Sequence, residues 1–308
     1  MHYLSATNVA RSALSLCGLT LLSYHNLLNA KPVQPALTIS VAPSSVNLEI
    51  DLVSTTPNTT NKKTSNKRKP ASRQSFADPL THFDYEHWWP SNGWFNGHPF
   101  ASRWQADAIS HNSNGMQLML NNRGSVDTPD WVSGEFRSRA YRGYGCYEIS
   151  MKPVARSGVI SSFFLYAGPH DIAPNGNGQH HEIDIEFLGD NTNFMQINFW
   201  RNGEPAAGKN ALLIPLQFDA ALDFHRYAIR WSAGKIKWYV DGLLVHQVNA
   251  KTNPYVPTTD ESTMMTMMNI WATSNDIAAW AGEFDPAVPM SQSHYKDFSY
   301  TPLKQCQL

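Results

Sequence analysis

The chain has 308 residues and a formal net charge of −1, and 16% of its residues are charged while 12% are aromatic. This near-neutral balance gives no electrostatic reason to expect a nucleic acid or an anionic membrane as a partner. A neutral partner with flat apolar faces suits the 10 Trp and 12 Tyr better.

The first 30 residues have the features of an export signal. Arg11 supplies a positive charge, an apolar run extends from Leu14 to Leu22, and the small residue Ala30 follows. The run is too short to span a bilayer, so we predict a cleaved signal peptide over residues 1–30 and a secreted protein. No other segment has the length and apolarity of a membrane span.

Residues 31–75 are rich in Pro, Ser, Thr, Asn and Lys. Such a segment lacks the apolar area that would offset the loss of chain entropy on folding, so we predict a disordered linker. The composition becomes globular at Phe76. We therefore predict one domain over residues 76–303, a short tail over 304–308, and a monomer.

Short alternating runs recur through the predicted domain, and each is bounded by Gly, Asn, Asp or Pro. They include Met116–Leu120, Tyr147–Lys152, Phe194–Phe199, Tyr227–Trp231 and Ile236–Val240. Asp241-Gly242 indicates a hairpin. Many short strands without a helical period predict an all-β protein with two packed sheets. We interpret Cys146, inside one such run, as a small buried hydrophobe, with a disulfide to Cys306 as the less favoured alternative.

One segment places three acidic residues in alternation with apolar ones. Glu182, Asp184 and Glu186 are separated by Ile183 and Ile185. Alternating β-branched residues favour a strand, which would put all three carboxyl groups on one face and the apolar side chains in the core. Three like charges this close are unfavourable, so catalysis, a metal ion or a set of basic partners must account for them.

The spacing of the two glutamates fits a glycosidase. Four strand residues separate the Glu182 and Glu186 backbones by about 13 Å, and side chains that lean together would leave roughly the 5–5.5 Å that retaining enzymes need. Slight splaying would instead give the larger gap of an inverting enzyme. Asp184 can share a proton with Glu182 and hold its rotamer. The alternatives are a solvated strand face and a calcium site, although collinear side chains cannot surround an ion without ligands from loops.

The strand Glu182-Ile-Asp-Ile-Glu-Phe-Leu-Gly189 resembles the active-site strand of glycoside hydrolase family 16, specifically the bacterial lichenases, which are endo-β-1,3-1,4-glucanases. Other segments resemble that group in the same order: Tyr144–Pro153, Ser161–Pro169, Trp238–Gly242 and Met268–Trp271. The resemblance covers residues 83–302. It implies a concanavalin A-like jelly-roll β-sandwich of two antiparallel sheets with an open concave cleft, a β-glucan polysaccharide as partner, and no required cofactor.

The resemblance also implies roles for single residues. Glu182 would be the nucleophile, Asp184 its assistant and Glu186 the general acid/base. The residues that would bind the sugar chain are Trp94, Asn96, Glu135, Arg137, Tyr166, His180, Asn198, Trp200, Asn269 and Trp271. Aromatic faces stack on pyranose rings, and amide, carboxylate and guanidinium groups hydrogen-bond hydroxyls. Trp231 and Trp238 are instead expected in the core.

Three features depart from the lichenase pattern. Ser102 and Ser133 stand where lichenases have a disulfide, and His180 and His181 stand where they have Trp and Asp. Lys296 aligns with an Asp that binds a structural calcium in the family. We therefore expect no calcium there, with the Lys ammonium in the place of the ion.

The sequence thus predicts a retaining endo-β-glucanase that cleaves internal β-1,4 bonds of mixed-linkage β-1,3-1,4-glucan by double displacement. Asn92–Gly97 and the loop after Pro169 resemble glycanases of bacterial exopolysaccharides as much as they resemble lichenases. A succinoglycan-like exopolysaccharide or a β-1,3-glucan is therefore the alternative substrate. A non-catalytic carbohydrate-binding module and a tethered surface interaction protein are the rival classes. The intact acidic triplet argues against the binding module, and a surface interaction protein would keep its effect after Glu182→Gln replacement.

Overall fold

The computed structural model describes residues 74–308 except for 126, 206–208 and 288–289. The predicted signal peptide over residues 1–30, and all but the end of the predicted linker over 31–75, lie outside the described residues. Within the part of the chain that is described, no helix has the length and apolarity needed to cross a bilayer.

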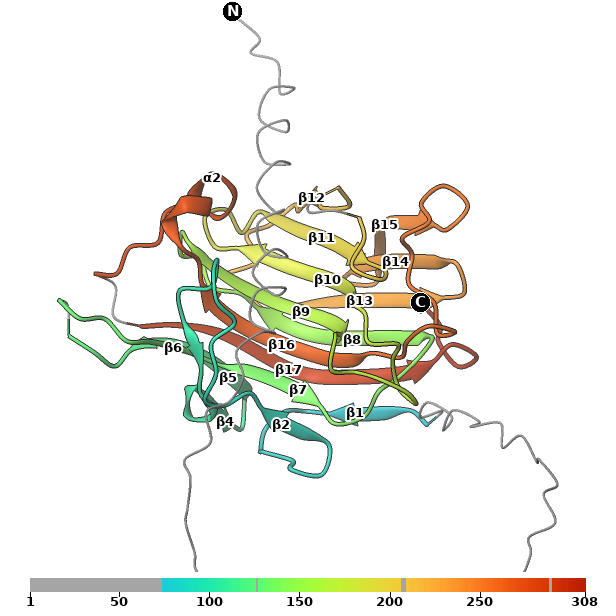
Figure 1. The fold of residues 1–308 in the computed structure, drawn as a ribbon, viewed down its shortest axis with the longest axis horizontal. Helices are drawn as coiled ribbons and strands as arrows, with labels where there is room; N and C mark the ends of the chain where they lie inside the picture. Colours follow the sequence, from blue (N-terminus) through green and yellow to red (C-terminus); the bar gives the residue numbers. More distant parts are fainter. Residues whose placement is uncertain (1–73, 126, 206–208, 288–289) are drawn as a thin grey trace, which may run out of the picture.

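Two β-sheets lie one behind the other (Figure 1). The larger sheet has the order β15 (Leu243–Asn249), β14 (Lys235–Val240), β13 (His225–Ser232), β8 (Gly145–Lys152), β17 (Met290–Pro302), β5 (Gly115–Asn122), β6 (Trp131–Ser133) and β3 (Arg103–Trp104), with β1 (Phe76–Asp78) beside β17 and β4 (Ile109–Asn112) beside β5. The smaller sheet has the order β12 (Leu212–Pro215), β11 (Phe194–Trp200), β10 (His181–Leu188), β9 (Val159–Ala167), β16 (Met265–Ala272), β7 (Glu135–Ser138) and β2 (Trp88–Pro90).

All strand pairings in these sheets are antiparallel except that of β3 with β6. The helical elements among the described residues are one-turn pieces: the 3-10 turns Ala106–Ala108 and Asn275–Ile277, and α2 (Ala278–Ala281). The predicted all-β, two-sheet jelly-roll sandwich is therefore confirmed.

Apolar side chains at alternate positions along the strands fill the space between the sheets. On β10, Ile183 and Ile185 point into this core and are fully buried. Trp231 on β13 and Trp238 on β14 are also fully buried, as their strand positions predicted. Because the period of a strand is two, the residues between these core positions must project from the opposite face of each sheet.

Hydrogen bonds across the core tie the smaller sheet to the larger one. The indole Nε1 of Trp238 donates to the main-chain oxygen of Asp184 at 3.0 Å. The hydroxyl of Tyr295 on β17 lies 2.9 Å from the main-chain oxygen of Asn269 and 3.2 Å from that of Ser162. Buried donors of this kind resist displacement, because sliding one sheet over the other would leave them unpaired. The backbones of β9, β10 and β16 are thereby held in place.

Ser102 and Ser133 lie side by side. The Ser133 hydroxyl donates to Ser102 Oγ at 2.9 Å, and Ser102 Oγ also accepts the main-chain N–H of Ala272 at 3.2 Å. Their adjacency agrees with the sequence resemblance, which places a disulfide at these two positions in lichenases. A hydrogen bond replaces that covalent link in this chain.

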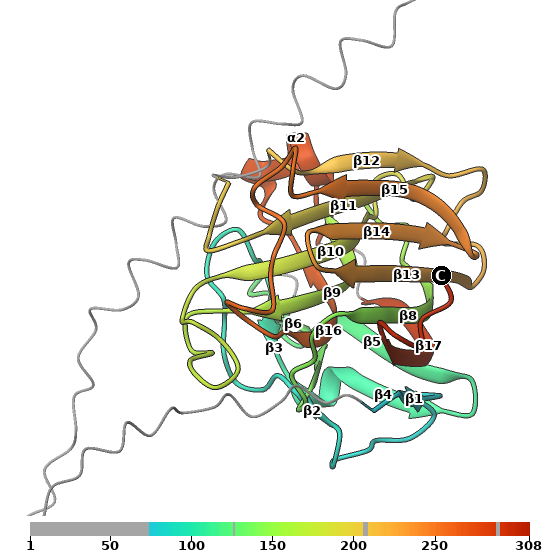
Figure 2. The same cartoon turned by 90° about the vertical axis from the view of Figure 1, so that its right-hand side faces the viewer.

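Cys146 forms a disulfide with Cys306, with the two Cα atoms 5.8 Å apart. The interpretation of Cys146 as an isolated hydrophobe is therefore wrong. Cys146 pairs with Thr301 on β17, and the chain turns directly after that strand, so Cys306 comes back to β8. Residues 304–308, predicted as a short tail, are attached to the sandwich by this bond. Both views place the C terminus beside β13 (Figures 1 and 2), where Arg230 donates to the main-chain oxygen of Leu308 at 2.6 Å.

Replacing Cys146 and Cys306 together by serine is expected to destabilise the domain by about 2–4 kcal/mol, because the bond closes a loop of 160 residues in the unfolded chain. For a domain of this size the midpoint of thermal unfolding should fall by roughly 5–15 °C. Calorimetry of the double variant and of the reduced wild-type protein tests this. Equal midpoints for the double variant, the reduced wild-type protein and the oxidised wild-type protein would show that the bond does not stabilise the fold.

Candidate active site

β10 carries its acidic residues on the outer face of the smaller sheet, which is the face directed away from the larger sheet. Ile183 and Ile185 occupy the core side, so Glu182, Asp184 and Glu186 share the other side. Asp184 is buried, whereas both glutamates keep part of their surface exposed. The two longer carboxyl side chains are thus accessible from solution on either side of a buried third one.

Neighbouring strands add one residue on each side of every acid. The partners on β9 and β11 are Tyr166 and Trp200 for Glu182, Phe164 and Asn198 for Asp184, and Ser162 and Gln196 for Glu186. Beyond β9 the same face is continued by Met265, Met267, Asn269 and Trp271 on β16 and by Glu135 and Arg137 on β7. The register of the sheet therefore assembles one continuous face from five strands.

The surroundings of Asp184 favour the protonated form of its carboxyl group. Phe164, Met265 and Met267 form a buried apolar cluster next to it. Burial raises the pKa of Asp184 well above its usual range, and the charges of Glu182 and Glu186 and a hydrogen bond with Glu182 act in the same direction. In its protonated form, which burial favours, Asp184 donates its O–H to the Glu182 carboxyl group.

Glu186 has a different set of contacts. Burial raises its pKa to about 7, and the charge of Glu182 adds to this effect. The amide Nε2 of Gln196 donates to Glu186 Oε2 at 2.7 Å and acts in the opposite direction. The indole Nε1 of Trp280 in turn donates to Gln196 Oε1 at 2.9 Å, which fixes the orientation of the amide.

Gln196 and Trp280 are missing from the residues that the sequence pointed to. Gln196 alternates with Asn198 and Trp200 along β11, so the strand pattern contained the signal needed to find it. Trp280 comes from α2, a single turn far along the chain, and no local pattern connects it to the acidic strand.

On the side of this face away from β11, strand β7 contributes Glu135 and Arg137. Glu135 is buried and accepts hydrogen bonds from the Ser91 hydroxyl and, at 3.4 Å, from Asn269 Nδ2. Burial raises the pKa of Glu135, while its hydrogen bond from Ser91 and the charge of Arg137 oppose the increase. The Arg137 guanidinium lies 3.9 Å from the centroid of the Trp89 ring, and Trp94 is its second aromatic neighbour.

Two of the predicted sugar-binding residues are heavily engaged by the protein itself. Asn96 Oδ1 accepts the indole N–H of Trp104 at 3.0 Å. Trp271 packs against Phe100, with ring centroids 4.1 Å apart, and near Trp280. Only 4% of Trp271 is exposed, so its ring leaves little free area for a sugar.

His180, Tyr166 and Trp200 form an aromatic group around Glu182. The His180 ring is stacked on Trp200 with centroids 5.5 Å apart and lies 5.6 Å from Tyr166. His180 Nε2 is 2.6 Å from Glu182 Oε2. The remaining sequence-predicted residue, Asn198, is buried directly opposite Asp184.

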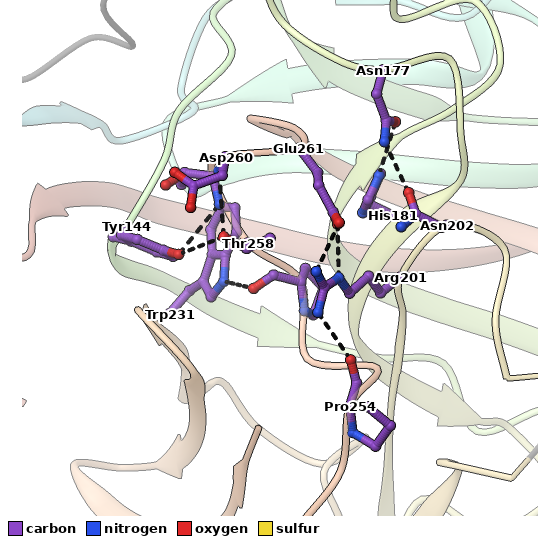
Figure 3. A network of polar contacts seen from close by, with 12 residues as sticks. Tyr144, Asn177, His181, Arg201, Asn202, Trp231, Pro254, Thr258, Asp260 and Glu261 are labelled. Atoms are coloured by element: carbon purple, nitrogen blue, oxygen red, sulfur yellow. Dashed lines mark hydrogen bonds and ion pairs between the residues drawn. The ribbon is translucent and has the colours of Figure 1, made fainter. Parts of the chain in front are cut away.

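A polar network holds the loops around the start of β10 (Figure 3). The ring of the fully buried His181 hydrogen-bonds Asn177 Oδ1 at 3.0 Å, and Asn177 Nδ2 donates to Asn202 Oδ1 at 2.8 Å. Arg201 makes two hydrogen bonds of 2.7 Å to Glu261. Burial lowers the pKa of His181 to about 4, so the ring is neutral at neutral pH and its Nε2 carries the proton.

The residues around Lys296 do not fit a calcium ion. Lys296 lines a pocket on the larger sheet together with Lys152, and Asp297 is the single carboxylate among its lining residues. The Lys296 ammonium lies 4.5 Å from the centroid of the Phe224 ring. Two ammonium groups repel a divalent cation, which requires several oxygen ligands. Among the residues that the structure describes, no three His, Cys, Asp or Glu side chains are grouped to hold a metal.

Carboxyl pairs of this kind, displayed on an open strand face, are the machinery of glycoside hydrolases, and this is the class to which the protein belongs. Within that class the chain is a member of glycosyl hydrolases family 16, whose family model matches residues 96–288. The resemblance identified from the sequence is therefore confirmed.

Several relatives are named β-glucanases. A β-glucanase of Paenibacillus polymyxa is 38% identical over 73% of this chain and 87% of its own, and one of Bacillus subtilis is 39% identical over 74% and 86%. Among solved structures, the Bacillus licheniformis β-glucanase is 36% identical with a TM-score of 0.65 and covers 74% of this chain and 97% of its own. A lichenase from a mouse hindgut metagenome is 31% identical, also with a TM-score of 0.65, over 74% and 99%.

Proposed function

We propose that the protein is a secreted, retaining endo-β-glucanase that hydrolyses internal β-1,4 bonds of mixed-linkage β-1,3-1,4-glucan. The observation that carries this proposal is the arrangement on β10, where two accessible glutamates flank a buried aspartate on one strand face. The relatives named β-glucanase support the substrate class, and the lichenase among the solved structures supports the mixed-linkage assignment. The disulfide between Cys146 and Cys306 suits an oxidising, extracellular setting.

In the first half-reaction a Glu182 oxygen attacks the anomeric carbon while the Glu186 carboxylic acid protonates the departing glycosidic oxygen. In the second, the Glu186 carboxylate takes a proton from water, the water oxygen bonds to the anomeric carbon, and the bond to Glu182 breaks. The raised pKa of Glu186 suits this alternation, because a group that titrates near pH 7 donates and accepts a proton with little penalty.

The direct test incubates the purified protein with barley β-glucan, lichenan, laminarin and a succinylated bacterial exopolysaccharide. New reducing ends from the first two, with the β-anomer appearing first in proton NMR spectra, are expected. First appearance of the α-anomer would refute retention. Cleavage of the exopolysaccharide alone would favour the alternative substrate. Binding without cleavage of any glucan would leave a carbohydrate-binding module.

The pH profile should show Glu186 acting as the acid. Because the first step needs the protonated form, kcat/KM for β-glucan should fall as pH rises above about 7, the pKa to which burial raises Glu186. Gln196 donates to the ionised form, so Gln196→Leu should move this alkaline limb to higher pH. Initial rates from pH 4 to 10 measure both effects. A limb that stays in place, or moves to lower pH, contradicts the assignment.

A further inference from the structure

His180 contacts the proposed nucleophile directly, and its ring Nε2 lies 2.6 Å from Glu182 Oε2. Both side chains are partly buried, with 16% of His180 and 20% of Glu182 exposed, so solvent screens the contact only in part. We propose that His180 is a positioning residue that holds one oxygen of the Glu182 carboxylate and promotes release of the sugar from the glycosyl-enzyme intermediate. This inference rests on the retaining mechanism proposed above.

The identity of the donor follows from the partners. An ionised carboxylate has no proton to give, so in the neutral ring the proton of His180 must be on Nε2. The other nitrogen, Nδ1, is buried and has no hydrogen-bond partner among the described residues. Without a proton, Nδ1 is a buried acceptor that lacks a partner, which this position tolerates. With a proton, it would be a buried N–H donor that lacks a partner, which is unfavourable. The structure therefore favours a single arrangement, with Nε2–H directed at Glu182.

Three contacts position His180, two of them to its ring and one to its main chain. Trp200 stacks on it at an interplanar angle of 28°, and Tyr166 borders it. The main-chain oxygen of His180 accepts the N–H of Gly203 at 2.8 Å. Asn202 and Gly203 both have positive φ angles, of 55° and 76°, which form the turn that brings this N–H within reach. A donor held this way loses little entropy when it binds the carboxylate.

Glu182 therefore has a hydrogen-bond donor two residues away on each side along the chain: His180, and Asp184 in its protonated form. Hydrogen bonds to an ionised carboxylate are roughly twice as strong as those to a neutral acceptor such as an ester. The His180 contact thus strengthens whenever negative charge returns to Glu182. This happens in the second half-reaction, when water attacks the anomeric carbon and the electron pair of the breaking C–O bond returns to the carboxylate.

The hydrogen bond from His180 should therefore affect the two half-reactions unequally. In the first step the carboxylate loses charge, so a donor on Oε2 gives no electrostatic advantage, although it keeps the side chain aimed. In the second step the same donor stabilises the transition state, because the carboxylate gains charge. Removing the donor should therefore slow deglycosylation more than glycosylation. A residue that only maintained the local structure would slow both.

The test compares His180→Phe, which keeps an aromatic ring but has no donor, with His180→Gln, whose amide can donate. The substrate is a 2,4-dinitrophenyl β-glycoside of a mixed-linkage β-1,3-1,4-glucotrisaccharide, with which glycosylation is fast. For His180→Phe we expect kcat to fall about tenfold, kcat/KM to change much less, and the trisaccharide adduct to accumulate in intact-mass spectra of quenched enzyme. His180→Gln should recover most of kcat.

His246→Phe, on β15 of the other sheet, is the matched control and should behave as wild type. An equal fall of kcat and kcat/KM without adduct, unchanged kinetics in His180→Phe, or no recovery in His180→Gln would overturn the proposal while leaving the glucanase assignment intact. A wild-type enzyme that hydrolyses no β-glucan, or that inverts configuration, would overturn the proposed function and this inference with it. Thermal unfolding of each variant checks that the fold is retained.

Discussion

Replacing Glu182 with glutamine is expected to lower kcat on β-glucan by about 10⁴-fold or more, because the proposed covalent intermediate can no longer form. Glutamine has nearly the same shape as glutamate, so the packing against Tyr166 and Trp200 should survive. Its amide cannot attack the anomeric carbon. Initial rates on lichenan measure the loss, and intact-mass spectra with a 2-deoxy-2-fluoro β-glycoside should show an adduct on the wild-type protein only.

The matched control is Glu148→Gln on β8. Glu148 is also partly buried and accepts a hydrogen bond from Arg226 at 2.8 Å, but it lies on the larger sheet. Its replacement should change the unfolding temperature slightly and leave the rate on lichenan as in wild type. If Glu182→Gln retained more than about 1% of wild-type activity, another residue would have to be the nucleophile.

The acidic strand could be predicted because its information is local. Alternation of Glu182, Ile183, Asp184, Ile185 and Glu186 fixes which side chains face the core as soon as the segment is a strand. The burial of Trp238 was also expected, and Asn198, which the family resemblance implied as a site residue, lies opposite Asp184. A period-two pattern predicts which side chains are buried because burying the polar face of a strand is strongly unfavourable.

Such patterns could not predict contacts between segments that are far apart in the sequence. The Cys146–Cys306 bond depends on how the chain turns after β17, and two cysteines 160 residues apart give no signal of that turn. The hydrogen bond from Trp280 to Gln196 depends on where α2 rests against the smaller sheet. Each requires the three-dimensional path of a loop, and loop paths are governed by side-chain contacts that have no sequence period.

The protonation states illustrate the same limit. A row of three acids predicts mutual repulsion, but not which one keeps its proton. The structure assigns it through burial: Asp184 is enclosed beside Phe164 and Met267, whereas Glu186 has the amide of Gln196 as a donor. Desolvation is the largest cause of the raised pKa for both groups. The chemistry of the strand therefore depends on residues from β9, β11 and β16 as much as on its own sequence.

Replacing Glu186 with alanine is expected to lower kcat on β-glucan by about 10³-fold, because a sugar leaving group needs an acid. A dinitrophenolate leaving group does not, so glycosylation by a dinitrophenyl β-glycoside should remain fast and deglycosylation should become limiting. Sodium azide, which attacks without a general base, should then raise the rate and give a β-glycosyl azide. Product NMR identifies the anomer. An α-azide, or no acceleration by azide, would contradict the assignment of Glu186 as acid/base of a retaining enzyme.

Glu186→Gln should separate activity from stability. The pKa of Glu186 rises from an ordinary value of 4.5 to about 7 in the folded protein, so between these pH values the folded state holds a proton that the unfolded chain has released. Stability therefore falls as pH rises through this window, and the loss is complete above about pH 7. Glutamine does not ionise, and its carbonyl oxygen can still accept from Gln196. The inactive variant should consequently gain unfolding temperature relative to wild type as pH rises from 4.5 to 8, whereas a constant difference would show that the Glu186 carboxylate is not destabilised by burial.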